Sequence, residues 1–233
     1  MPVAVISGGG TGIGYAIARA LAQDGYDLTL IGRRADVLHA AARRLDGYVE
    51  VLPADLTQPD DVEQAAASLA KVDVLVNNAG AVPVQPGPSL ADVADWWLAN
   101  FNANVLSAAL LTEALTPKLT ADASVVFLSS IAAQRGGRGP YSAAKAALHG
   151  YAASLARDLA PVTVNVIAPG YVEGTDLFER PPTDAETRRR LGETLTGRVG
   201  TPADVAETVR WLARARHVTG QVISINGGAV FGR

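Results

Sequence analysis

Short apolar runs alternate with helical segments along almost the whole chain, and this alternation restricts the possible folds more than any other feature. Such runs are typical of strands buried on both faces, and the intervening segments have helical periodicity. A repeated strand–helix–strand order favours a parallel sheet with right-handed crossovers. The sequence therefore predicts an α/β fold: one doubly wound domain over residues 1–233, with a seven-stranded parallel sheet and helices on both faces.

The expected strands span Val3–Ser7, Asp27–Ile31, Tyr48–Leu52, Asp73–Val76, Ser124–Leu128, Val162–Ala168 and Gln221–Ile225. The expected helices span Gly14–Gln23, Ala35–Leu45, Pro59–Ala70, Ser89–Asn100, Ala103–Leu119, Tyr141–Leu159 and Pro202–Ala213. One segment, at about residues 171–198, is too polar to lie inside the sheet. We expect it to form a short helical insertion over the active cleft. Its basic run Arg188–Arg190 is interpreted as a solvated helix face in preference to a binding patch.

Composition and charge exclude several classes of protein. The chain has no cysteine, which excludes disulfides and thiolate metal sites, and its histidines do not cluster, so no metal site is expected. A net charge of -3 gives no basic footprint for nucleic acid. No apolar run is long enough to span a membrane, and the N-terminus does not resemble a signal peptide. We expect a cytoplasmic location.

A glycine-rich turn joins the first strand to the first helix. Gly8, Gly12 and Gly14 have the spacing G-x-x-x-G-x-G. Glycine allows tight turning and close approach of the backbone to a ligand, and the N-terminus of the helix presents free N–H groups to a pyrophosphate. The position of the turn therefore predicts a dinucleotide site.

The end of the second strand indicates which dinucleotide binds. A site for NAD usually has an acidic residue there, which bonds the ribose 2′-hydroxyl. This chain has Gly32, Arg33 and Arg34 instead. Arg33 can bind a 2′-phosphate in a bidentate fork, so we predict NADP(H) and consider NAD(H) the weaker alternative. The competing interpretation is that both arginines are merely solvated. Asp55, after the third strand, is expected near the adenine.

Tyr141 and Lys145 are four residues apart at the start of a predicted helix, so their side chains share one face. A nearby positive charge favours a phenolate and lowers the pKa of a tyrosine. The pair is thus a candidate proton donor and acceptor near neutral pH.

Together, these motifs resemble those of the short-chain dehydrogenase/reductase family, and the resemblance covers essentially the whole chain. It rests on Gly8–Gly14, Asn77–Gly80, Asn104, Ser129–Ser130, Tyr141 with Lys145, Pro169–Gly170, Thr219–Gly220 and Gly227–Gly228. The resemblance implies a Rossmann-type fold and a homo-oligomer, either tetramer or dimer. It implies that the helices around 103–119 and 141–159 and the C-terminal strand build the subunit contacts.

The resemblance also implies a catalytic set. Tyr141 protonates the carbonyl oxygen, Lys145 lowers the tyrosine pKa and bonds the nicotinamide ribose, and Ser130 donates a hydrogen bond to the substrate oxygen. Asn104 holds a water that links Lys145 to a proton relay. Ser129 is the alternative to Ser130, and the nearby asparagines at 100 and 102 are alternatives to Asn104.

The implied cofactor-binding set extends from the glycine turn to the end of the sixth strand. Asn78, Ala79 and Gly80 line the cofactor near its ribose, although the Asn78 amide could instead tie adjacent strands together. Pro169, Gly170, Val172 and Thr175 flank the nicotinamide. The complete predicted set is Gly8, Gly10, Thr11, Gly12, Ile13, Gly14, Arg33, Arg34, Asp55, Leu56, Asn78, Ala79, Gly80, Tyr141, Lys145, Pro169, Gly170, Val172 and Thr175.

The expected reaction is hydride transfer between NADP(H) and a ketone, giving a secondary alcohol, or its reverse. The expected pocket walls are the residues after Asn78, the segment 132–138, and the insertion with its Tyr171, Leu177 and Phe178. Two alternatives stay open. One is an NAD-dependent alcohol dehydrogenase, and the other is a non-catalytic NADP-binding regulatory protein.

Overall fold

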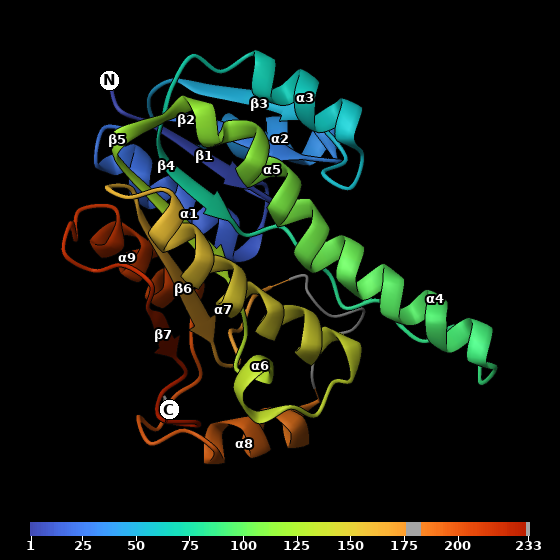
Figure 1. The fold of residues 1–233 in the computed structure, drawn as a ribbon. Coiled ribbons are helices and arrows are strands. Elements are labelled where there is room, and N and C mark those ends of the chain that lie inside the picture. The colour runs from blue at the N-terminus through green and yellow to red at the C-terminus, as the bar shows by residue number, and fades with distance from the viewer. Residues whose placement is uncertain (176–182, 232–233) are drawn as a thin grey trace.

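A seven-stranded parallel sheet runs through the molecule in the order β3-β2-β1-β4-β5-β6-β7, which confirms the predicted fold class (Figure 1). The computed structural model describes residues 1–175 and 183–231. The strands are Val3–Ser7 (β1), Asp27–Gly32 (β2), Val49–Pro53 (β3), Val72–Asn77 (β4), Leu119–Leu128 (β5), Thr163–Pro169 (β6) and Val222–Ile225 (β7).

The strand order reverses between β1 and β4. The chain moves outward from β1 to β3, returns to place β4 against the other side of β1, and continues outward to β7. Val5 pairs with Leu75 at this junction. Ligands of open parallel sheets bind in the crevice beyond the carboxyl ends of the strands at such a reversal. The topology therefore places the candidate site at the C-terminal ends of β1 and β4.

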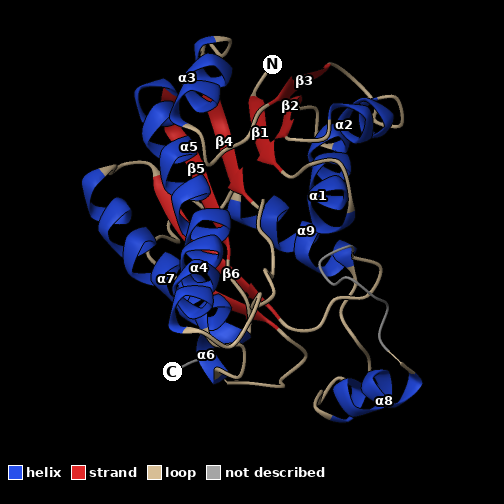
Figure 2. Cartoon of the chain, turned by 90° about the vertical axis from the view of Figure 1, so that its right-hand side faces the viewer, coloured by secondary structure: helices blue, strands red, loops and turns tan. Residues whose placement is uncertain are grey.

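Helices cover both faces of the sheet (Figure 2). Helices α1, α2 and α9 lie on one face, and α3, α5 and α7 lie on the other. The helices are Gly12–Gln23 (α1), Ala35–Ala42 (α2), Pro59–Ala67 (α3), Leu90–Phe101 (α4), Ser107–Leu115 (α5), Ala132–Arg135 (α6), Pro140–Asp158 (α7), Asp184–Gly192 (α8) and Pro202–Leu212 (α9). In the part of the chain that the structure describes, no helix is long and apolar enough to cross a membrane.

The strand side chains alternate between two hydrophobic clusters. In β1, Ile6 belongs to the same hydrophobic cluster as Ile17 of α1, whereas Val5 belongs to the cluster that contains Leu111 of α5, on the opposite face. Adjacent residues of a strand point to opposite faces, so a strand covered on both sides is apolar throughout. This is why β1 is an uninterrupted apolar run and why its position could be predicted.

The local structure differs from the sequence prediction at the helix over 103–119 and at α6. The predicted helix over 103–119 is interrupted, because a π-helical turn, Asn102–Leu106, joins α4 to α5. The predicted insertion contains α8, whose start is capped by Thr183 and Glu186, each accepting a backbone N–H from the other. Leu177 and Phe178 of the insertion lie outside the described residues. The short helix α6 was not predicted.

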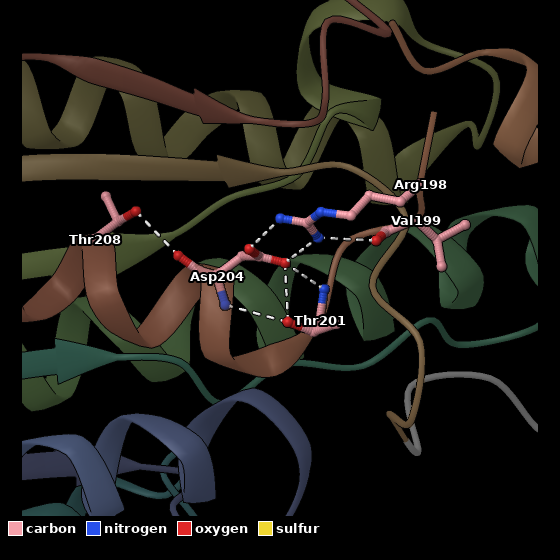
Figure 3. Close-up of polar contacts among 5 residues, drawn as sticks. All are labelled: Arg198, Val199, Thr201, Asp204 and Thr208. Atoms are coloured by element: carbon pink, nitrogen blue, oxygen red, sulfur yellow. Dashed lines mark hydrogen bonds and ion pairs between the residues drawn. The ribbon is translucent and has the colours of Figure 1, made fainter. Parts of the chain in front are cut away.

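The return from α8 to the body of the protein is fixed at the start of α9 (Figure 3). The Asp204 carboxylate accepts hydrogen bonds from the Thr201 backbone N–H and hydroxyl, at 2.7 and 2.9 Å. The Arg198 guanidinium binds both oxygens of the same carboxylate, at 2.7 and 2.6 Å. Gly200 pairs with Val172, beyond the end of β6. These contacts anchor the segment that follows α8 beside the carboxyl ends of the strands.

Candidate functional site

A cavity of about 880 Å³ lies at the carboxyl ends of the strands, where the strand order reverses. Its walls include the loops after β1, β2, β4, β5 and β6 together with the start of α7 and part of α8. Every predicted site residue lines this cavity except Asn104. Residues that are far apart in the sequence are thus brought to one place. Tyr171 also lines the cavity, as do residues 132 and 135–138 of the predicted segment 132–138.

The glycine turn is packed too closely to accept side chains. Gly8 and Gly12 have positive φ angles of 67° and 52°, a backbone conformation that favours glycine. A Cβ on Gly14 would lie 2.2 Å from the Gly8 carbonyl oxygen. Thr11 is the N-cap of α1 but makes no side-chain cap hydrogen bond. The first-turn N–H groups of α1 therefore face no capping side chain, and their dipole favours an anion.

Asn78 performs the structural task that the sequence left open. Its amide nitrogen donates to the carbonyl oxygens of Ser7, at 2.9 Å, and Gly8, at 3.3 Å. The backbone N–H groups of Asn78 and Ala79 donate to the Ser7 hydroxyl, at 2.9 and 3.0 Å. These contacts hold the ends of β1 and β4 together while Asn78 also lines the cavity.

The end of β2 places two exposed cations on the cavity. Arg33 and Arg34 both follow Gly32 and line the same wall as Asp55. The Asp55 carboxylate accepts hydrogen bonds from the Thr57 backbone N–H, at 3.0 Å, and hydroxyl, at 2.8 Å. The Thr57 N–H bond is the largest cause that lowers the Asp55 pKa, and the charge of Arg33 adds to the lowering. Asp55 is thus ionised and held by its own turn.

Tyr141 and Lys145 are both 5% exposed and share one face of α7. The Lys145 Nζ lies 5.9 Å from the centre of the Tyr141 ring and donates a 2.8 Å hydrogen bond to the Leu128 carbonyl oxygen. Burial lowers the pKa of Lys145 to about 8. Burial also raises the pKa of Tyr141, and the Ser130 hydrogen bond and the Arg138 charge offset only part of that rise.

This result differs from the sequence prediction that Lys145 lowers the Tyr141 pKa. The prediction considered the attraction between a cation and a phenolate but not the cost of taking both charges out of water. In the structure, that cost favours the neutral form of each group. The charge that does lower the Tyr141 pKa belongs to Arg138, three residues earlier in the chain.

The two adjacent serines point in different directions. The Ser129 hydroxyl donates to the Lys145 carbonyl oxygen, at 2.8 Å, and lies 2.9 Å from the His149 Nε2. The Ser130 hydroxyl accepts the Ala132 N–H at 3.1 Å and hydrogen-bonds Tyr141. Ser130 is therefore the serine that interacts with the Tyr141 phenol, whereas Ser129 links the end of β5 to α7 by hydrogen bonds.

Asn104 lies behind the cavity wall, in the π-helical turn. Its amide exchanges hydrogen bonds with the Ala81 backbone, at 2.8 and 3.2 Å, and donates to the Asn100 carbonyl oxygen at 3.0 Å. A Cβ on Gly80 would lie 2.6 Å from the Asn104 Oδ1 and 3.1 Å from the Lys145 Nζ. Both polar atoms therefore approach the same side of Gly80.

Residues 8–230 match the family described as enoyl-(acyl carrier protein) reductase. The human dehydrogenase/reductase SDR family member 4 is 34% identical, over 97% of this chain and 86% of that protein. This chain belongs to the short-chain dehydrogenase/reductase family. The granaticin polyketide synthase putative ketoacyl reductase 2 of Streptomyces violaceoruber is 35% identical to this dehydrogenase/reductase, over 98% of this chain and 96% of that protein. This chain is therefore an oxidoreductase.

Solved structures agree with this assignment. A blue fluorescent protein from a metagenomic library, in complex with NADPH, has a TM-score of 0.88 and 31% identity to this short-chain dehydrogenase/reductase, covering 99% of this chain and 98% of that one. Members of this family use a nicotinamide cofactor. The glycine turn, which a Cβ would fill, and the uncapped start of α1 fit its pyrophosphate.

Sequence reasoning missed part of the cavity wall. Arg189 and Arg190 line the cavity, which the interpretation as a solvated helix face did not anticipate, although Arg188 and Arg189 are exposed as that interpretation expects. A run of three arginines does not reveal which of them faces inward until the helix is placed. Arg138 also gave no signal of its own beyond its place in the predicted segment 132–138.

Proposed function

We propose that this enzyme reduces a ketone to a secondary alcohol with NADPH, or catalyses the reverse reaction. The observation that carries the proposal is that Tyr141, Ser130 and Lys145 line the same cavity as the glycine turn and Arg33. The name of the Streptomyces relative, a putative ketoacyl reductase, supports the substrate class. The NADPH in the blue fluorescent protein supports the cofactor.

The buried phenol suits the proton donor that carbonyl reduction needs. Because burial raises its pKa, Tyr141 carries its proton at neutral pH and can deliver it to the carbonyl oxygen as negative charge develops there. The Ser130 hydroxyl, beside the phenol, donates a second hydrogen bond to the same oxygen. The bound cofactor supplies the hydride.

Lys145 and Asn104 support the proton donor in this proposal. Lys145 bonds the nicotinamide ribose, and its charge then acts on the phenol from the cofactor side. Asn104 Oδ1 accepts one hydrogen bond from Ala81 and has a second lone pair for a water shared with Lys145. The approach of both groups to Gly80 supports this role.

Tyr141→Phe tests the catalytic assignment. We expect turnover of a ketone panel with NADPH to fall about 10²–10⁴-fold, the usual contribution of a positioned acid, while NADPH affinity stays unchanged. The matched control is Tyr151→Phe, because Tyr151 lies on the same helix but donates to Glu113 outside the cavity. Retained turnover in Tyr141→Phe contradicts the assignment. A wild-type enzyme that binds NADPH but reduces no ketone favours the regulatory alternative.

Arg33→Ala tests the cofactor assignment. A charge-assisted hydrogen bond contributes about 1.5–3 kcal/mol, so we expect NADPH to bind about 10- to 100-fold more weakly and NADH to bind as before. Arg43→Ala is the control, because Arg43 is exposed at the end of α2 and does not line the cavity. Unchanged NADPH affinity in Arg33→Ala favours the NAD-dependent alternative.

The expected dimer or tetramer remains a prediction. Apolar side chains on and after α4 support it, because Leu98 is 60% exposed and Trp97, Phe101 and Leu106 are also exposed. Exposed apolar clusters of this kind often mark subunit contacts. Light scattering coupled to size-exclusion chromatography measures the mass, and a monomer at micromolar concentration contradicts the prediction.

A further inference from the structure

Lys145 has the surroundings of a reactive amine. Its Nζ makes one hydrogen bond among the described residues, to the Leu128 carbonyl oxygen at 2.8 Å. No carboxylate in the described part of the chain pairs with this nitrogen, and burial is the cause of its lowered pKa of about 8. The cationic form of a lysine has no free electron pair with which to attack a carbon atom. A buried lysine without an acidic partner loses its proton more easily and so becomes a nucleophile.

The Lys145 nitrogen lies beside the cavity. Lys145, Leu128 and Gly80 all line it. Gly80 has no side chain on the side that faces the amine, where a Cβ would lie 3.1 Å from Nζ. The cavity, of about 880 Å³, is far larger than a small carbonyl compound. Such a compound can therefore approach the amine from the cavity.

The groups around the amine do not hold its proton by charge. The Tyr141 ring centre is 5.9 Å from Nζ, and burial raises the pKa of Tyr141, so the phenol stays neutral and can donate a proton to a carbonyl oxygen. His149 is one turn further along α7, and burial lowers its pKa, which favours its neutral form. The end of β4, β5 and the π-helical turn contribute uncharged residues, namely Gly80, Leu128 and Asn104.

These surroundings increase the amount of free amine. At pH 7, about one Lys145 side chain in ten is neutral, against about one in three thousand for a lysine with the ordinary pKa of 10.5. Only the neutral amine adds to a carbonyl carbon. Lys145 therefore offers about 300 times more reactive amine at pH 7 than an ordinary lysine does.

We propose that Lys145 captures aldehydes as imines in the cofactor-free protein, so that it is a site of covalent modification. The Nζ adds to the aldehyde carbon to form a carbon–nitrogen bond, and the bond from that carbon to oxygen breaks. The two protons that the amine loses leave with the aldehyde oxygen as water, so no oxidant or reductant is consumed. Bound cofactor blocks the reaction; this clause alone rests on the proposed function, in which Lys145 bonds the nicotinamide ribose.

Reductive trapping with propanal tests the imine. Cyanoborohydride converts the imine to a stable secondary amine, and peptide mass spectrometry then measures the rate of modification at each lysine. At neutral pH we expect Lys145 to react about 10-fold faster or more than Lys71, which is half-exposed and paired with Asp73 at 3.2 Å. Denaturing urea should remove this preference, because it depends on the fold. Lys145→Arg, which keeps a cation but forms no imine, should lose this adduct while Lys71 is labelled as before.

Addition of NADP⁺ separates this proposal from the reductase proposal. NADP⁺ carries no hydride that could reduce the aldehyde, and it should slow the modification of Lys145 while leaving that of Lys71 unchanged. If Lys145 reacts no faster than Lys71 in the folded protein, or if its preference persists in urea, the imine site is overturned whatever the enzyme reduces. If Lys145 reacts rapidly but NADP⁺ gives no protection, the imine site stands and the placement of the ribose at Lys145 fails.

Discussion

Gly14→Ala perturbs the closest packing in the nucleotide end of the cavity. The added Cβ would lie 2.2 Å from the Gly8 carbonyl oxygen and 2.6 Å from the Asn78 amide nitrogen. Neither group can turn away easily. The Gly8 oxygen belongs to the backbone of the turn, and the Asn78 amide binds the carbonyl oxygens of Ser7 and Gly8. The substitution must therefore move the turn relative to the end of β4.

The expected cost has two parts. Overpacking a rigid contact typically costs about 1–3 kcal/mol. Loss of the Asn78 hydrogen bonds adds about 1 kcal/mol for each bond broken. The helix preference of alanine over glycine returns about 1 kcal/mol, so we expect a net loss of about 1–4 kcal/mol in the free energy of unfolding. NADPH affinity should fall as well, because we propose that the displaced turn binds the pyrophosphate.

Gly150→Ala is the matched control. Gly150 lies in the interior of α7, and a Cβ there meets no atom within 4 Å. Only the helix preference remains, so this variant should be more stable than the wild type by about 0.5–1 kcal/mol. Urea-induced unfolding measures both stabilities, and fluorescence titration measures NADPH affinity. If Gly14→Ala matches Gly150→Ala in both measurements, the close contact between the turn and β4 is refuted.

Three further substitutions test other parts of the structure. The pKa of Lys145 is about 8 in the fold against an ordinary 10.5, so the unfolded chain binds more protons between these values. Stability of the cofactor-free protein should therefore rise as pH increases from 8 to 10.5, and Lys145→Met should abolish that rise in urea titrations. Phe127→Ala removes a fully buried ring that meets Tyr151 edge-on, and calorimetry should show a loss of about 3–5 kcal/mol. Asn78→Ala should cost about 1–3 kcal/mol in urea and weaken NADPH binding, and an unchanged affinity contradicts its role in shaping the turn.

The strands of the sheet were predictable because each is specified by a short, local stretch of apolar residues. Each central strand is buried on both faces and therefore reads as a short apolar run, as in Val3–Ser7, whose predicted and observed limits agree. Helix limits were less certain. The helix predicted from Gly14 begins at Gly12, and the one predicted to Leu45 ends at Ala42. Helix ends fray or tighten into 3₁₀ turns, so the limits of a helix vary by one or two residues and the sequence specifies them weakly.

The residues that line the candidate site were predictable as a set, but their contacts were not. The sequence predicted Asn104 as a site residue without showing that a π-helical turn places it behind Gly80, outside the cavity lining. It placed Tyr141 beside Lys145, yet the direction of the Tyr141 pKa depends on burial, which only the fold determines. The inward orientation of Arg190 likewise depends on where α8 lies over the cavity.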